Sequence, residues 1–269
     1  MKHILSDIYI YPVKSLAGIK FDEAEVTERG LKNDRRWMLV DENNQYLTQR
    51  TISKMALINV ELENGLIKFS VKNSTEKLEI DTTQPAYQKS KIIVWEDLVE
   101  AEFVSHSADE WFSDILKIKC RLVYMPDEAK RFVNKNYAKN NEVVSFADGF
   151  PFLIIGQSSL DDLNNRIGDT IPMNRFRPNF VFTGGEPFDE DRMESFMLNN
   201  IKFFPVKPCS RCIITTINQS TGAISKEPLQ TLSAYRKINK RIMFGQNLLH
   251  EGSGRIKVGT ELRGIKWKE

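Results

Sequence analysis

The chain has 269 residues, of which 41% are hydrophobic and 28% charged, and its formal net charge is +2. This composition is typical of a globular protein with one large or two modest domains. The small net charge argues against a nucleic-acid or membrane-surface binder. The longest apolar run, at 150–155, is far shorter than the roughly 18–20 residues of a membrane span, and the N-terminus has no signal-peptide pattern. We therefore expect a cytoplasmic protein with three reduced cysteines.

The first predicted strand, at 4–11, ends at Pro12 and leads into a short polar turn. Lys14 and Ser15 lie in that turn, where an ammonium, a hydroxyl and backbone N–H groups are suited to an anion. A solvated loop is the alternative interpretation, since most such turns face water.

A second region predicts a hairpin, with strands at 38–40 and 46–48 around a turn at 41–44. Alternation places Arg35 on the same face as Trp37. If that face is inward, the Arg35 guanidinium needs an anionic partner, whereas on an edge strand it would be solvated. Both interpretations stay open, and they apply equally to Arg50.

Further short strands follow. A second hairpin is predicted at 57–62 and 66–71, joined by Asn64 and Gly65, which form a strong turn dipeptide. A capping-box pattern at 107–110 predicts the start of a helix. Many short strands with few helices indicate a β-rich barrel or an α+β fold. The polar stretch 127–142 has little periodicity and is predicted to connect two lobes.

The second half of the chain contains two more candidate ligand residues. Asp148 stands beside Gly149, a pair that most often forms a turn and less often holds a ligand. Arg177 precedes Pro178, which predicts an extended backbone and an aimed side chain. A planar guanidinium held this way suits bidentate contact with phosphate or carboxylate; a solvated turn arginine is the alternative.

The pair Cys209 and Cys212 is followed by an apolar, β-branched run at 213–217 that predicts a strand. A thioredoxin-like redox pair would instead need a helix after it. A zinc site needs four ligands, and the chain offers only Cys120 and three scattered histidines besides this pair. An incidental Cys-x-x-Cys remains open. The other possibility is one thiolate bound to a soft metal centre that brings its own further ligands.

Six motifs occur here in the order found in MOSC-domain proteins. They are Tyr11-Pro12-Val13-Lys14-Ser15, Asp34-Arg35-x-Trp37, Phe176-Arg177-Pro178-Asn179, Cys209-Ser210-Arg211-Cys212-Ile213-x-Thr215-Thr216, Phe244-Gly245-Gln246 and Ile256-Lys257-Val258-Gly259. Over nearly its whole length the chain resembles the branch that includes the mitochondrial amidoxime-reducing component and its bacterial relatives. The resemblance implies a β-rich α+β fold, with an N-terminal MOSC β-barrel-like domain at 1–125. A C-terminal MOSC β-barrel domain with a few helices is expected at 126–269.

The resemblance also implies a molybdenum cofactor, Mo-molybdopterin, held between the two lobes. Cys212 occupies the position that binds molybdenum, and Cys209 a position without a ligand role. The cofactor contacts carried over are Lys14, Ser15, Arg35, Asp148, Arg177, Asn179, Ser210, Arg211, Cys212 and Asn247, the last through its backbone. Arg211 is expected to help keep Cys212 as a thiolate. Asp148 is also a candidate catalytic residue, as a proton donor.

The implied activity is reductive removal of oxygen from small N-hydroxylated substrates, with the cofactor supplying the redox chemistry. Some relatives carry a ferredoxin domain, for which this sequence lacks the four cysteines. We therefore expect a separate electron donor: a ferredoxin-like, flavodoxin-like or cytochrome b5-like protein with its reductase. No nucleic-acid or membrane partner is expected. Alternatives are a non-catalytic molybdenum cofactor carrier or delivery protein, a sulfur-transfer protein, and a metal-free interaction module.

Overall fold

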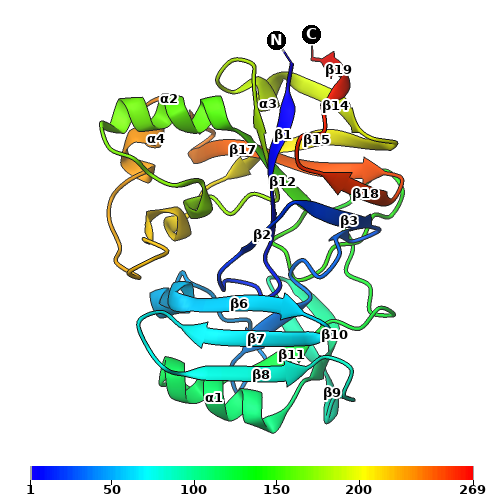
Figure 1. Cartoon of the computed structure of the whole chain (residues 1–269), viewed down its shortest axis with the longest axis vertical. Helices are drawn as coiled ribbons and strands as arrows, with labels where there is room; N and C mark the ends of the chain where they lie inside the picture. Colours follow the sequence, from blue (N-terminus) through cyan, green and yellow to red (C-terminus); the bar gives the residue numbers. More distant parts are fainter. Residues whose placement is uncertain (1, 269) are drawn as a thin grey trace.

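A computed structural model describes residues 2–268 and contains two lobes, one above the other (Figure 1). The strands of the upper lobe are β1 (Ile4–Ile10), β2 (Ile19–Phe21), β3 (Glu23–Thr27), β4 (Gly30–Leu31), β12 (Phe152–Gly156), β13 (Phe180–Thr183), β14 (Met193–Leu198), β15 (Ile201–Ser210), β16 (Lys237–Ile238), β17 (Arg241–Glu251), β18 (Gly254–Lys257) and β19 (Arg263–Trp267). The strands of the lower lobe are β5 (Trp37–Val40), β6 (Ile58–Glu63), β7 (Leu66–Val71), β8 (Lys77–Asp81), β9 (Gln88–Val94), β10 (Asp97–Phe103) and β11 (Arg121–Tyr124). The helices are α1 (His106–Leu116), α2 (Gln157–Ile167), α3 (Asp189–Arg192) and α4 (Leu229–Tyr235), with short 3-10 helices η1 (Ser53–Leu57), η2 (Met173–Arg175) and η3 (Ile213–Thr216). The β-rich α+β class predicted from the sequence is confirmed.

The largest sheet is in the upper lobe and has nine strands, eight of them in the order β19-β14-β15-β17-β12-β13-β1-β2, with β16 beside β17. β12 and β13 run parallel, whereas β1 pairs antiparallel with β13. The start of the chain is therefore built into the same sheet as its second half. The domain division at residue 125 stays a prediction, and this sheet takes strands from both sides of it.

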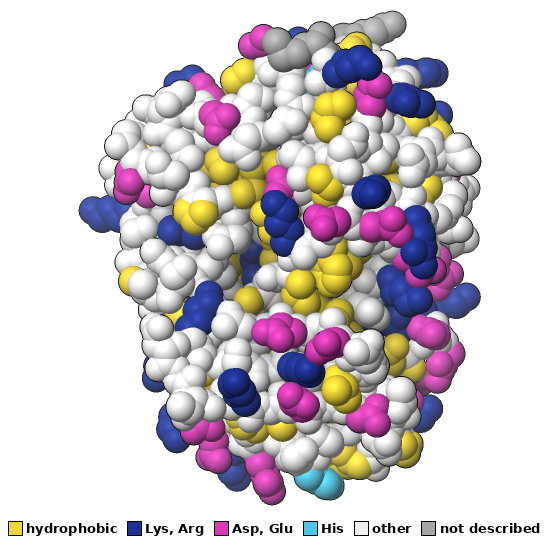
Figure 2. All heavy atoms as spheres, in the orientation of Figure 1, with side chains coloured by type: hydrophobic (Ala, Val, Ile, Leu, Met, Phe, Trp, Pro, Cys, Tyr) yellow, Lys and Arg dark blue, Asp and Glu magenta, His cyan; other side chains and the backbone are white. Residues whose placement is uncertain are grey.

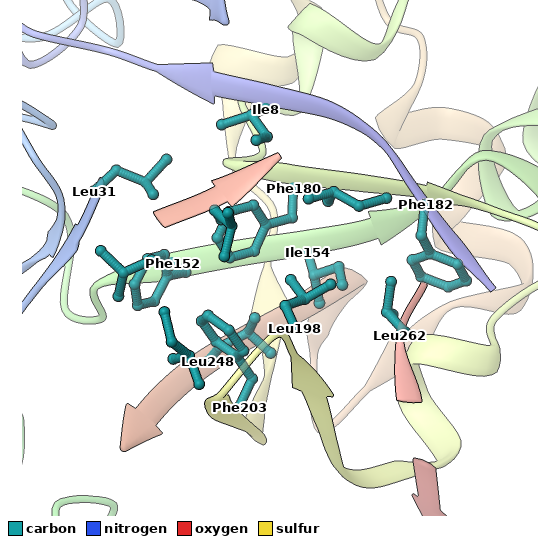
Figure 3. Packing of buried hydrophobic residues seen from close by; sticks show 14 of the residues in the cluster. Ile8, Leu31, Phe152, Ile154, Phe180, Phe182, Leu198, Phe203, Leu248 and Leu262 are labelled. Atoms are coloured by element: carbon teal, nitrogen blue, oxygen red, sulfur yellow. The ribbon is translucent and has the colours of Figure 1, made fainter. Parts of the chain in front are cut away.

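The main core of the upper lobe is rich in aromatic side chains (Figure 3). Phe152 stacks on Phe180 with ring centroids 5.2 Å apart, and Phe203 meets both rings edge-on. Alternate residues of β12 and β13 face opposite sides of the sheet, so Phe152 and Phe180 enter this core while Leu153 and Val181 enter a second one on the other face. The core fixes the ends of β1, β12 and β15, from which the segments between the lobes emerge.

The lower lobe contains a four-stranded sheet, β5-β11-β10-β9, and a three-stranded sheet, β6-β7-β8. The predicted hairpin at 57–71 is confirmed, with β6 and β7 in register from Ile58↔Val71 to Glu63↔Leu66. Helix α1 covers this lobe, and Phe112 packs edge-on against Phe69 with centroids 4.9 Å apart.

Three local predictions were wrong. β5 pairs with β11 along one edge, and on its other edge the expected return strand keeps only the bridge Val40↔Tyr46, because Trp37 at the start of β5 bridges Val13. Helix α1 begins at His106, one residue before the serine of the predicted capping box, since Ser105 is its N-cap and its Oγ accepts a hydrogen bond from the Ala108 N–H. Over residues 2–268 the sheets follow open paths and form no closed barrel.

The expected strand at 213–217 was also wrong, because η3 begins directly after Cys212. The hydroxyl of Thr215 donates to the Cys212 carbonyl at 3.0 Å, and that of Thr216 to the Ile213 carbonyl at 2.8 Å. Such local hydroxyl-to-backbone bonds compete with strand pairing. Ile213 is 45% exposed, so the apolar run does not enter the core there.

Acidic and basic side chains are interspersed over the face shown in Figure 2. This view fits the small net charge of the chain. Within residues 2–268, no helix has the length and apolar character needed to cross a membrane.

Candidate functional site

One cleft brings together all ten cofactor-binding candidates from the sequence, including the metal and catalytic candidates. Its lining contains Lys14, Ser15, Arg35, Asp148, Arg177, Asn179, Ser210, Arg211, Cys212 and Asn247. The empty space in the cleft is about 810 Å³, including the part open to solvent.

The Lys14–Ser15 turn follows directly from β1 and is tied to the lower lobe. The Lys14 N–H donates to the Trp37 carbonyl at 2.8 Å. Ser15 has a left-handed backbone, with φ of 66°, and its carbonyl accepts a 2.7 Å bond from Nε2 of Gln49. Non-glycine residues rarely adopt this conformation, so the surrounding contacts must hold it.

Lys14 is a buried cation, 4% exposed. Its Nζ donates to Oδ1 of Asp148 at 2.5 Å and to the Phe146 carbonyl at 2.8 Å. Burial lowers the pKa of Lys14 to about 8 although Asp148 raises it, and Arg131 and Arg50 lower it further. At neutral pH the ammonium is therefore still protonated, and keeping this charge buried costs free energy of folding.

Asp148 is the carboxylate at the centre of this charge cluster. Its side chain is 63% exposed, and Nη2 of Arg50 lies 3.5 Å from Oδ2. Desolvation raises the pKa of Asp148, but Lys14, Arg50 and Arg35 outweigh it and hold the pKa below its usual range. Asp148 is consequently a carboxylate at neutral pH.

Arg35 lies in a turn and not on the strand face predicted for it, since its φ is 50° and β5 begins only at Trp37. Its Nη1 donates to Oδ2 of Asp34 at 2.6 Å and to Oδ1 of Asn179 at 3.1 Å. Asn179 is 1% exposed, and its Nδ2 donates to the Tyr9 carbonyl. Asn179 thus holds Arg35 in place from the sheet.

Arg177 was predicted to be extended, and its φ of 57° shows that it is left-handed instead. The chain turns here between η2 and β13, while Nη1 of Arg177 reaches the Leu16 carbonyl at 2.7 Å. Its Nη2 is buried and has no hydrogen-bond partner within residues 2–268. Burial lowers the pKa of Arg177 to about 10, with Tyr11 raising it and Arg35 lowering it. Its guanidinium therefore stays charged.

The two cysteines lie at the end of β15, where Ser210 is the last residue of the strand. Nη1 of Arg211 donates to Sγ of Cys209 at 2.9 Å and its Nη2 to the Phe176 carbonyl at 2.6 Å. Its guanidinium therefore contacts the sulfur of Cys209, and the expected influence of Arg211 on the Cys212 thiolate stays a prediction. Nε of Arg211 is buried without a partner in the described part of the chain.

Arg50 comes from the lower lobe and is an arginine that interacts with the side chain of Cys212. Burial lowers the pKa of Arg50, but Asp148 and the hydrogen-bonded thiol of Cys212 raise it above its ordinary value. Its guanidinium carbon also lies 4.5 Å from the centroid of the Trp95 ring. The sequence marked Arg50 only as a strand-end arginine; nothing local in it indicates contact with Cys212.

Arg131 stabilises the loop that precedes Asp148, and the sequence did not single it out. It is 5% exposed and donates to the carbonyls of Ser145 at 3.0 Å and Ala147 at 2.6 Å. Its Nε donates to Oδ2 of Asp97 at 2.7 Å. Arg131 therefore braces the loop that presents Asp148. It lies in the stretch predicted as a connection, where periodicity carries no signal.

Asn247 lies on β17, opposite Lys207 of β15 and Leu153 of β12. Its Nδ2 donates to the Lys207 carbonyl at 3.1 Å. One amide hydrogen is therefore used across the sheet, and the expected ligand contact through the backbone stays a prediction.

The charge balance and the unpartnered donors of the cleft fit an anionic ligand. Five cationic side chains line it, Lys14, Arg35, Arg50, Arg177 and Arg211, against the single carboxylate of Asp148. Buried donors are normally paired, and the free Nη2 of Arg177 and Nε of Arg211 are two exceptions at one site. A phosphate-bearing cofactor with a metal for Cys212 matches this donor set. Within residues 2–268, no three His, Cys, Asp or Glu side chains are clustered to hold a metal ion themselves.

Fold and cleft together define a two-lobed, β-rich protein with a cationic ligand site beside a thiol. The MOSC N-terminal beta barrel domain matches residues 2–119, and the MOSC domain matches residues 141–263. Mitochondrial amidoxime-reducing component 1 of Homo sapiens is 31% identical over 274 residues, covering 95% of this chain and 81% of that protein. Mitochondrial amidoxime reducing component 2 of Homo sapiens is 32% identical over 242 residues, covering 86% of this chain and 72% of that protein.

A molybdenum cofactor sulfurase of Arabidopsis thaliana is 29% identical over 271 residues; the alignment covers 93% of this chain but only 33% of that protein. The chain belongs to the family of MOSC-domain proteins that also carry the MOSC N-terminal domain, with the mitochondrial amidoxime-reducing components among its relatives.

Proposed function

We propose that this protein is a molybdenum-dependent reductase that removes oxygen from small N-hydroxylated compounds such as hydroxylamines, amidoximes and N-hydroxylated nucleobases. The comparisons point to the molybdenum cofactor as its cofactor. The observation that carries the proposal is the convergence of the ten sequence-predicted residues in one cleft with an excess of positive charge. Amidoxime reduction is named for relatives that share about 30% of their residues with this chain, so the substrate class is part of the proposal.

The residues divide into a metal-binding part and an anion-binding part. Sγ of Cys212 would bind molybdenum, while Lys14, Arg35 and Arg177 would hold the phosphate of the pterin. Ser15, Ser210 and Asn247 line the same cleft and would contact the organic part, partly through their backbones. When bound, the cofactor supplies the two-electron redox chemistry that the side chains cannot.

The protein's own contribution is charge, orientation and a proton. Arg50 interacts with the side chain of Cys212 and would help to orient that sulfur toward the metal. Nζ of Lys14 carries a proton at neutral pH, with a pKa of about 8. Asp148 has a lowered pKa and is a weak proton donor, so we propose that it orients Lys14 and Arg50.

An apolar wall limits water at one side of the site. Phe150, Phe152, Leu153 and Phe176 line the cleft beside the charged residues. Exclusion of water strengthens the attraction between the cations and an anionic ligand.

The electron donor would be a separate ferredoxin-like, flavodoxin-like or cytochrome b5-like protein with its reductase. We also propose a cytoplasmic location, although the relatives named above are mitochondrial. Fractionation of cells with a specific antibody would test the location, and reconstitution with each donor class would test the partner.

The deciding experiment is purification from a host that makes the cofactor, followed by molybdenum and pterin analysis. The loaded protein is then given benzamidoxime and a chemical reductant, and benzamidine is measured. Metal with turnover supports the reductase, whereas metal without turnover supports a carrier. A persulfide on a cysteine, seen by intact mass, would favour sulfur transfer. Protein without molybdenum or pterin would refute the proposal.

A further inference from the structure

The ring of Tyr11 lies under two cations of the cleft. The guanidinium carbons of Arg35 and Arg177 are each 4.3 Å from its centroid. The two carbons are therefore at most twice that distance apart. Charge-assisted hydrogen bonds of ~2.8 Å from two such groups reach the oxygens of a single phosphate. Tyr11 itself is 1% exposed, so its ring is a fixed part of the site.

Both arginines are held in place before any ligand arrives. Each has a left-handed backbone, which is unfavourable for a side chain with a Cβ and is found where the surroundings impose it. Arg35 donates to Asp34 and Asn179, and its Nη2 reaches the Arg177 carbonyl at 3.3 Å. Two like charges this close repel, and the negative face of an aromatic ring offsets that repulsion.

The contact depends on the ring and not on the hydroxyl of Tyr11. Its Oη is buried and has no hydrogen-bond partner within residues 2–268. A Cβ added at Gly18 would lie 2.4 Å from Cε1 of Tyr11, so the absence of a side chain there lets the turn that carries Lys14 close onto the ring edge. The same ring therefore contacts two cationic residues of the cleft and packs against the end of the turn that carries Lys14.

We propose that Tyr11 is a positioning residue whose ring face sets Arg35 and Arg177 at the spacing at which both bind one phosphate group. The proposed function identifies that phosphate as the one on the pterin; the role of Tyr11 requires only a phosphate ligand. Arg177 supplies its free Nη2 to this anion.

The test measures binding of inorganic phosphate to cofactor-free protein by calorimetry. Tyr11→Phe removes the unpartnered hydroxyl, and its affinity for phosphate should be within about twofold of that of the parent, because its ring still faces the cations. A trifluorinated phenylalanine at position 11 keeps the ring but weakens its negative face, and should bind roughly threefold or more weakly. Tyr11→Leu should lose about tenfold or more. Arg177→Gln gives the phosphate affinity that remains when one of the two arginines is absent.

Equal phosphate affinity for the phenylalanine and trifluorinated forms would overturn the proposal, and so would an equal loss in Tyr11→Phe and Tyr11→Leu. A parent protein that binds phosphate no better than Arg177→Gln would overturn it too. Three fluorines add far less change in volume than the loss of the ring, so a buried aromatic with only a packing role should respond to ring fluorination much less than to Tyr11→Leu. Molybdenum content of the parent protein, measured separately, tests the proposed function. If the protein contains no molybdenum but its phosphate affinity still falls in the expected order among the variants, the role of Tyr11 stands and the reductase function is refuted.

Discussion

Lys14→Met provides a direct measure of what the buried cation costs the protein. The lysine is 4% exposed, and burial lowers its pKa from 10.5 to about 8. Methionine has a similar length without charge, so it fills the same space. The exposed carboxylate of Asp148 loses a partner but keeps Arg50 at 3.5 Å.

The magnitude follows from linkage. A pKa lowered from 10.5 to about 8 means that the unfolded chain binds the proton more tightly, which costs the folded state about 3 kcal/mol at neutral pH. The cost is fully present below about pH 8 and disappears as the pH rises to about 10.5, where the unfolded lysine also loses its proton. Methionine leaves the buried Phe146 carbonyl without its 2.8 Å donor, which costs about 1 kcal/mol. The cofactor-free variant should therefore be about 2 kcal/mol more stable than the parent near pH 7.

The assay is urea unfolding of both cofactor-free proteins at about pH 7 and about pH 10. The stability advantage of Lys14→Met, about 2 kcal/mol near pH 7, should have disappeared near pH 10, while loaded protein from a cofactor-making host should contain much less molybdenum. Lys119→Met, at an 81% exposed side chain, is the matched control and should show no such change. A difference in unfolding free energy that does not depend on pH would refute the reasoning.

Four further predictions concern the site and one buried carboxyl group outside it. Cys212→Ala should abolish activity and release molybdenum, with Cys209→Ala much milder; equal loss by metal analysis would indicate a paired-thiol site. Arg177→Lys should lower cofactor occupancy, since an ammonium cannot serve both the Leu16 carbonyl and a phosphate as a planar fork does; unchanged pterin content would contradict this. Arg131→Ala should lower the unfolding free energy by about 2–4 kcal/mol, because several hydrogen bonds to the Asp148 loop are lost; denaturant midpoints check it. The buried Glu190 has a pKa raised to about 7 by burial, so Glu190→Gln should stabilise the protein by about 2–3 kcal/mol near pH 8 and by little near pH 4.5; melting curves at both values decide.

The sequence was sufficient wherever structure depends on near neighbours. The β6–β7 hairpin follows from alternation around Asn64 and Gly65, and the β-rich class follows from many such short strands. Arg35 and Arg177 were singled out as candidate anion ligands by position alone. Their backbone conformations were not foreseen, because left-handed φ values at non-glycine residues are imposed by contacts far along the chain.

The sequence by itself determined the inventory of this protein: the strands, one Cys-x-x-Cys and the cations beside strand ends. Tertiary structure alone decided which of them meet. Pairing of β1 with β13 brings Tyr11 and Arg35 to Arg177. Packing of the lower lobe against the upper one brings Arg50 to Cys212, while Arg211 contacts Cys209. The physical reason is that a side chain's partner in the cleft is set by sheet order and by the burial of the strands that carry it, neither of which is encoded in the few residues around it.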